Sequence, residues 1–391
     1  MKFAVRVGAG DTSAAPNFHC SKLVESWVVR GALLLTILFC VLMGIGLPQS
    51  NKKIDPDAGY TPTVLLEDKK KKKGADVTQA LALPPELPAA VTAETGRLAF
   101  QVTPLSAKGL LSQQTRDALK TLLRSNRGPI VKLRAFVAGS GDLRRVGEIA
   151  GEMFLEKHMP LPALTVAQVG ALPLEGAQVV IEATEVDRKV VNPSGVAFLA
   201  AQPAPSVAES LAKLKSALAA AGMQPSDALL VTCFVSSLDD QRGTQPAMSA
   251  AFPGAALDYV QMQRAPVMPP AACEATARLT KPADSSDSQR ALVSAPQVVI
   301  TGTQLAFGTR DSDLKLAFER LEKALAAKGA RSDRVAIAHL YVTSTALTSR
   351  VLAFESSQAG GTRLSTVLPV EALPSVDASF GLDVIAIPIG P

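Results

Sequence analysis

Alternating apolar and polar positions predict a similar β-strand three times in the later part of the chain. The three stretches read PIVKLRAFVAGSGDL (129–143), ALLVTCFVSSLDD (228–240) and VAIAHLYVTSTAL (335–347). Their apolar residues recur with a period of two, which is typical of a strand, and each stretch ends in small polar residues that favour a helix start. Each also carries one aromatic residue: Phe136, Phe234 and Tyr341.

A helix is predicted before each of these strands, over residues 113–124, 207–221 and 313–328. The second and third helices are followed by Gly222 and Gly329, and glycine readily adopts the left-handed conformation that ends a helix. The first helix lacks such a glycine, so the first copy has diverged from the other two.

Each strand is followed by a second predicted helix, a corner and a closing strand. The second helices end at Phe154, Phe252 and Phe354. The closing strands VVIEATEV, AACEATAR and GLDVIAI each carry one acidic residue of interest: Glu182, Glu274 and Asp383. A strand pair is also expected before each first helix, visible as RLAFQV (97–102), GVAFLAAQ (195–202) and VVITGTQ (298–304). The predicted order is strand, strand, helix, strand, helix, strand, strand.

This order recurs roughly every 100 residues, which is the size of a domain and far longer than a solenoid repeat. We therefore expect three modules: module 1 (95–190), module 2 (191–280) and module 3 (295–391). The seam between modules 1 and 2, VDRKVVNPSG, is short. Residues 281–294 are polar and predict a looser linker.

The first 48 residues are expected to form a leader. Residues 31–47 are an uncharged apolar run that follows Lys22 and Arg30. Such a run is either a signal peptide or an uncleaved membrane anchor, and both predict export to a periplasmic or other extracytoplasmic space. Residues 49–94 are rich in lysine and proline and predict a solvated linker, with the folded region beginning near residue 95.

Composition narrows the class of protein. The chain has 391 residues, of which 47% are hydrophobic and 19% charged, as in folded domains with ample cores. The net charge of +5 is mild, and much of it comes from the lysines at 69–73. Aromatic residues make up only 4%. We therefore expect no nucleic-acid partner, because such proteins need broad basic faces or exposed stacking rings.

The cysteines and histidines point to no cofactor or metal. Of the four cysteines, only Cys233 and Cys273 lie in the predicted folded part. They form no disulfide framework, and no CxxC pair is present for zinc. The three histidines, at 19, 158 and 339, are far apart in sequence and are expected to be surface or core residues.

The ordered motifs resemble the RidA family, also called YjgF, of enamine/imine deaminases. The stretches that carry the resemblance are VVITGTQ, ALLVTCFV, LSTVLPVEALP and VVIEATEV, and it extends over roughly residues 95–390. The resemblance implies an α+β fold of chorismate-mutase-like units, each a mixed sheet with two helices on one face. Family members assemble as homotrimers with ligand sites between subunits, so three fused units imply an intramolecular pseudo-trimer. Three separate modules on a string, or a chain that trimerises again, are the alternatives.

In the family, an arginine in the motif before the Leu-Pro corner clamps the carboxylate of the substrate. Carried over by position, that arginine corresponds to Leu164, Leu257 and Leu364. Leucine cannot hold a carboxylate, whereas the guanidinium fork donates two parallel hydrogen bonds. Arg363 precedes Leu364. Because a shift of one residue in a strand turns a side chain to the other face, Arg363 is only a weak candidate to replace the clamp.

Other family positions are partly kept. The serine and glycine of the family's second strand correspond to Thr301 and Gly302 in module 3, and to Ala200 and Ala201 in module 2. The closing-strand acids Glu182, Glu274 and Asp383 resemble the family's water-orienting glutamate. The simpler interpretation, which we favour, is that each acid pairs with a neighbouring base or backbone group.

Two functions follow from this pattern. The first is an exported scaffold or binding protein, without enzymatic activity, that takes a small apolar or weakly polar ligand in the clefts between modules. The second is an active deaminase that hydrolyses enamines or imines and releases ammonia, with Arg363, Arg134 or Arg264 as the clamp. The three leucines favour the first. We expect a monomer with three fused modules, which contacts a membrane only if residues 31–47 are not cleaved.

Overall fold

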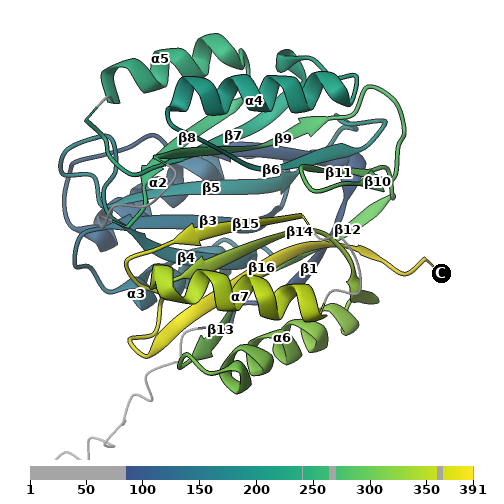
Figure 1. Ribbon diagram of the computed structural model, residues 1–391. Coiled ribbons are helices and arrows are strands. Elements are labelled where there is room, and N and C mark those ends of the chain that lie inside the picture. Colours follow the sequence, from purple (N-terminus) through teal and green to yellow (C-terminus); the bar gives the residue numbers. More distant parts are fainter. Residues whose placement is uncertain (1–84, 240, 264–269, 359–363, 391) are drawn as a thin grey trace, which may run out of the picture. The chain divides into compact units, whose positions relative to one another are not determined.

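The computed structural model describes residues 85–239, 241–263, 270–358 and 364–390. All of them belong to one compact unit, Gln79–Pro391. They form three mixed β-sheets, each covered by two helices (Figure 1). The predicted fold class, α+β with three sheet-and-helix units, is confirmed. The predicted leader and most of the first linker lie outside the described residues.

Module 1 contains four strands and two long helices. Its elements are η1 (Thr95–Arg97), β2 (Leu98–Val102), α2 (Leu111–Ser125), β3 (Ile130–Ala138), α3 (Leu143–Glu156), β4 (Ala163–Val169) and β5 (Val179–Val186). The strand order in the sheet is β2-β5-β3-β4. Only the pair β3/β4 is parallel, because α3 connects these two strands across the sheet.

Modules 2 and 3 repeat this order, except that module 3 has two strands before its first helix; the strand pair predicted there is a single strand in modules 1 and 2. Module 2 contains β6 (Val196–Ala204), α4 (Val207–Ala220), η2 (Pro225–Asp227), β7 (Ala228–Val235), α5 (Gln241–Ala251), β8 (Ala256–Gln261) and β9 (Ala271–Arg278). Module 3 contains β12 (Gln297–Thr301), β13 (Gln304–Phe307), α6 (Asp311–Ala326), β14 (Ala330–Val342), α7 (Thr345–Gln358), β15 (Leu364–Pro369) and β16 (Ala378–Pro388). Their sheets run β6-β9-β7-β8 and β12-β16-β14-β15, with β7/β8 and β14/β15 parallel.

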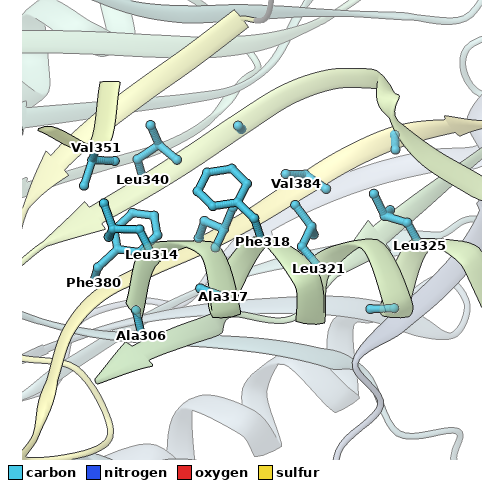
Figure 2. Close-up of a cluster of buried hydrophobic side chains, with 14 of the residues drawn as sticks. Ala306, Leu314, Ala317, Phe318, Leu321, Leu325, Leu340, Val351, Phe380 and Val384 are labelled. Carbon is cyan, nitrogen blue, oxygen red and sulfur yellow. The ribbon is translucent and has the colours of Figure 1, made fainter. Parts of the chain in front are cut away.

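The core of module 3 shows how the helices are held on their sheet (Figure 2). Along α6, Leu314, Phe318, Leu321 and Leu325 recur at helical spacing and are buried. They pack against strand residues such as Leu340 in the same cluster. This leaves the opposite face of the sheet to meet the other modules.

The segments before modules 1 and 3 contain strands where the sequence predicts linkers. β1 (Ala90–Glu94) lies in the predicted linker yet pairs antiparallel with β12 of module 3. The second predicted linker, 281–294, contains β10 (Ser285–Ser286) and β11 (Arg290–Val293), and β11 pairs with β6. Both segments satisfy the edge of an existing sheet, so backbone hydrogen bonds order them without a long apolar pattern.

The seam between modules 1 and 2 follows the same rule. The backbone N–H of Asp187 donates to Arg97 O, and those of Val191 and Asn192 donate to Gly96 O. Thus the segments before modules 1 and 3 add to the first strand of another module, whereas the segment before module 2 bonds to η1 of module 1. Because β1 pairs with β12, the first strand of the described chain belongs to the sheet of the last module.

Cys233 and Cys273 form a disulfide between β7 and β9. The sequence predicts no disulfide framework and does not predict this single bond. They lie directly opposite each other in the register, although they are 40 residues apart in sequence. The pairing depends on that register, which the spacing of two cysteines does not reveal.

Candidate functional site

The three sheets meet in a ring, and clefts lie between modules 1 and 2 and between modules 1 and 3. β4 of module 1 contacts β12 of module 3, β15 of module 3 contacts β6 of module 2, and β8 of module 2 contacts β2 of module 1. Each module thus presents its parallel edge strand to the first strand of the next. The sequence predicts ligand sites at such junctions between modules.

The cleft between modules 1 and 3 brings predicted site residues together. The backbone N–H of Thr303 donates to Leu164 O at 3.1 Å. A Cβ added to Gly302 would lie 3.1 Å from the same oxygen, so glycine permits this close approach. Thr301 is buried, and its hydroxyl accepts from the backbone N–H of Val384 at 2.9 Å. Leu164, Thr301 and Gly302 therefore share one junction.

The strand register corrects the assignment of Leu364. Leu133 pairs with Leu164 in module 1, and Val231 pairs with Leu257 in module 2. The equivalent residue of β14 is Ala338, whose partner is Ser365. Pro374 follows Ser365 by nine positions, as Pro173 follows Leu164, so the spacing to the corner agrees.

Leu364 and Ser365 consequently have different surroundings. Leu364 is buried in the hydrophobic cluster where all three modules meet. The Ser365 hydroxyl donates to the carboxylate of Glu355. Arg363 and Arg264, the two alternative clamps, lie outside the described residues.

The cleft between modules 1 and 2 is the more spacious of the two clefts measured, with a volume of about 700 Å³ against 200 Å³ beside Leu164. Much of its lining is apolar and includes Leu105, Leu174 and Leu257. Asp258 also lines it, and its Oδ2 atom has no hydrogen-bond partner among the described residues. Burial, reinforced by the nearby Glu182, raises the pKa of Asp258 well above its usual range, which favours the protonated form.

The closing-strand acids do not face these clefts with free carboxylates. Glu182, Glu274 and Asp383 are each less than a tenth exposed and line a common pocket between the three sheets. The register places them opposite Arg134, Thr232 and His339, at equivalent positions of the three middle strands. We call these acids, together with Lys132, Arg134 and His339, the axial charge cluster.

Arg134 joins modules 1 and 2. Its Nε donates to Glu182 Oε2 at 2.5 Å, and its Nη2 donates to Glu274 Oε1 at 2.8 Å. The guanidinium also lies 5.3 Å from the ring centroid of Phe136 and 5.8 Å from that of Phe234. These contacts hold a buried cation between two carboxylates and two aromatic faces.

His339 joins modules 2 and 3. Its Nδ1 lies 3.0 Å from Asp383 Oδ1, and its Nε2 lies 3.4 Å from Glu274 Oε1. Burial disfavours the charged ring, but the two carboxylates outweigh it and raise the pKa of His339 to about 9. The imidazole is therefore protonated at neutral pH.

Lys132 joins modules 1 and 3. Its Nζ donates to Thr165 Oγ1 at 2.7 Å, to Asp383 Oδ2 at 3.2 Å and to the carbonyl of Thr301. Burial lowers the pKa of Lys132, and Asp383 opposes that effect. Three acceptors match the three N–H donors of an ammonium group. The cluster thus contains three cations and three carboxylates.

The aromatic residues of the three predicted strands also come together. Phe136, Phe234 and Tyr341 belong to one buried cluster, and the rings of Phe136 and Phe234 meet edge to face, with centroids 6.1 Å apart. Tyr341 donates its hydroxyl to Asp383 Oδ2 at 3.2 Å. The described residues contain no group of His, Cys, Asp or Glu side chains arranged to hold a metal ion.

Sequence reasoning found the three acids and named Arg134 as an alternative, but it missed Lys132 and Asp258 and gave His339 no role beyond that of a surface or core residue. A signal was present, since Lys132 and Arg134 are two apart in an otherwise apolar strand and share one face of it. The favoured interpretation of the acids, pairing with a neighbouring base, agrees with the geometry.

No family model matches the sequence, and no curated protein matches it. Solved structures similar to this chain include Rv2704 of Mycobacterium tuberculosis, described as a YjgF/YER057c/UK114 family member, with 21% identity and a TM-score of 0.22; the match covers 23% of this chain and 78% of that one. YyfA of Yersinia pestis, of the Rid protein family, has 17% identity and a TM-score of 0.22, covering 23% and 79%. RidA of the Antarctic bacterium Psychrobacter has 15% identity and a TM-score of 0.22, covering 23% and 80%.

None of the helices that the structure describes is long and apolar enough to span a membrane. The apolar run at 31–47 lies outside the described residues.

Proposed function

We propose that this chain is an exported, three-module member of the RidA family that acts as a binding protein or scaffold and not as a deaminase. The ordered motifs and the threefold recurrence of one strand order support the family. The ring of junctions and the pairing of β1 with module 3 support a pseudo-trimer within one chain.

The observation that carries this proposal is the absence of a cation at the clamp position. Leu164, Leu257 and Ser365 occupy the register-equivalent places at the three junctions. Burying a substrate carboxylate there without a partner costs several kcal/mol.

The remaining catalytic groups of the family are also occupied. Glu182, Glu274 and Asp383 are each paired with a buried cation, so none is free to orient a hydrolytic water in a cleft. Arg134 already binds two carboxylates and is buried, which makes it unsuitable as the alternative clamp. The ligand suited to the clefts is therefore apolar or weakly polar, and the spacious cleft beside Leu257 is the favoured place.

The deaminase alternative is tested by supplying the full-length chain with an enzymatic source of 2-aminoacrylate and measuring ammonia release. We expect the release rate to equal that of the uncatalysed reaction, while an arginine-bearing family member accelerates it. A rate increase that is lost in Arg363→Ala or Arg264→Ala would overturn the proposal and identify the clamp.

Two further measurements test the assembly and its location. Light scattering of the full-length chain in detergent should give the mass of one protein chain, and a mass of three chains would contradict the intramolecular pseudo-trimer. The buried disulfide supports an oxidising compartment, because such bonds are rare in the cytosol. Recovery of the protein only from the cytosolic fraction would contradict export.

A further inference from the structure

A second site lies away from the clefts, in the pocket between the three sheets. This axial pocket has a volume of about 70 Å³, several times what one water molecule needs. One end is formed by the axial charge cluster. The walls are largely apolar and come from all three modules, including Phe100, Phe198, Ile300 and Ile337.

Two atoms of the charge cluster lack hydrogen-bond partners among the described residues. They are Arg134 Nη1, a donor, and Glu274 Oε2, an acceptor. Both residues line the axial pocket, and each is more than nine-tenths buried. The two side chains are joined to each other through Nη2 and Oε1, so one unpaired donor and one unpaired acceptor belong to directly bonded residues. Leaving such buried groups unpaired is unfavourable, so a ligand that satisfies both would be stabilised there.

We propose that the axial pocket binds a neutral amphiphile whose polar group both accepts a hydrogen bond from Arg134 and donates one to Glu274. A primary amide or an alcohol has this chemistry. The apolar part of the ligand would contact the aromatic and aliphatic walls. This site is independent of the proposed function, because Leu164, Leu257 and Ser365 are not among the residues that line it.

The charge balance argues for a neutral ligand. Lys132, Arg134 and His339 face Glu182, Glu274 and Asp383 within the same cluster. A carboxylate or an ammonium would add an uncompensated charge to a buried, balanced set, which is costly at low dielectric. A primary amide adds no charge and satisfies both unpaired atoms.

The exposure of the lining residues shows where the axial pocket opens. Phe100, Thr184, Leu230 and Ile385 line the pocket and are half-buried, whereas Arg134 and Glu274 are buried. The polar group of the ligand would therefore lie deepest, with its apolar chain towards these four residues. A longer chain should bind more tightly until the apolar walls are covered.

The test uses hexanamide as the probe, with hexanoate and hexylammonium as charged analogues, titrated into the full-length protein by calorimetry at neutral pH. We expect hexanamide to bind and each charged analogue to bind at least about tenfold more weakly. Shortening the amide by one methylene should weaken binding about fourfold. Equal affinity for an ion and the amide, or no binding of hexanamide up to its solubility limit, would overturn the proposal.

Variants distinguish this pocket from the clefts. Thr184→Trp fills the entrance and should abolish hexanamide binding, whereas Thr92→Trp, at an exposed strand position outside the pocket, should not. Leu257→Trp obstructs the cleft between modules 1 and 2 and should leave the affinity unchanged. Loss of binding in Leu257→Trp with retention in Thr184→Trp would place the ligand in the cleft and refute the axial site.

Discussion

The junctions and the axis of this molecule each bring together register-equivalent positions from the three modules. The residues at these two sets of positions differ in their charge and in how much they vary. At the clamp position of the junctions the three modules carry similar uncharged residues, Leu164, Leu257 and Ser365. On the axis the equivalent positions carry Arg134, Thr232 and His339, which differ in charge and size. The clamp position is thus uncharged in all three modules, whereas the axial position differs from module to module and is charged in two of them.

The difference follows from what a covalent chain permits. In a homotrimer, any residue near the threefold axis occurs three times, so an arginine there would face two other arginines. In one chain, each cation can stand opposite acids from two modules. Arg134 bridges modules 1 and 2, His339 bridges 2 and 3, and Lys132 bridges 1 and 3. This arrangement specifies the order of the modules as well as their association.

The severest test of that comparison is removal of the bridging arginine. Arg134→Met leaves Glu182 without its cation and Glu274 with His339 alone, and breaking a buried pair costs about 3–5 kcal/mol. Urea unfolding of the full-length protein should show a loss of that size. Lys120→Met removes an exposed pair with Asp117, for which we expect less than about 1 kcal/mol. Similar small losses in both variants would mean that the axial charges do not hold the modules together.

A disulfide within module 2 lies next to the axial charge cluster. Replacing both Cys233 and Cys273 by alanine opens a cross-link between residues 40 apart, which we expect to cost about 3–4 kcal/mol. The bond flanks Thr232 and Glu274 along the same two strands. If the charge cluster positions Glu274 by itself, hexanamide binding in the double variant should stay within about twofold of the wild type. Loss of binding would show that the axial pocket depends on the cross-link.

Much of the fold followed from the pattern of apolar residues. The helices predicted at 113–124, 207–221 and 313–328 match α2, α4 and α6 within two residues at each end. The seam strands β1 and β11 were missed, because they are edge additions stabilised by backbone hydrogen bonds and not by a buried apolar face.

The site was less accessible to sequence reasoning. The acids stood out because each interrupts an apolar closing strand, but their partners lie far along the chain: Lys132 and Asp383 are 251 residues apart. Strand periodicity fixes which face a side chain takes but not which module it meets. The misplacement of the clamp position at Leu364 arose the same way, since a one-residue error in register reverses the face.

The pH dependence of stability probes His339 directly. Its pKa is about 9 in the folded protein, set by Glu274 and Asp383 against burial and the nearby Arg134, and its ordinary value is 6.5. A raised pKa contributes stability that is fully present below pH 6.5 and is lost as the pH rises towards 9. The loss should be about 2–3 kcal/mol between these limits. In His339→Gln this part of the pH profile should be flat, and an unchanged slope would assign the titration to another group.

Substitution of Asp258 should give the smallest change in stability. This buried cleft acid lies near Glu182 and, among the described residues, has no cation of its own, in contrast to the axial acids. Its pKa is raised by burial and by Glu182, so the folded protein binds a proton that the unfolded chain releases above about pH 4. Stability is therefore lost as the pH rises above that value, and Asp258→Asn should remove the penalty and stabilise the protein at neutral pH. Glu274→Gln, the matched change on the axis, should instead destabilise it, since Arg134 and His339 lose a shared anion. If both amides destabilised the protein, the cleft acid would also have a stabilising partner; if both stabilised it, the axial pairs would carry no specific role.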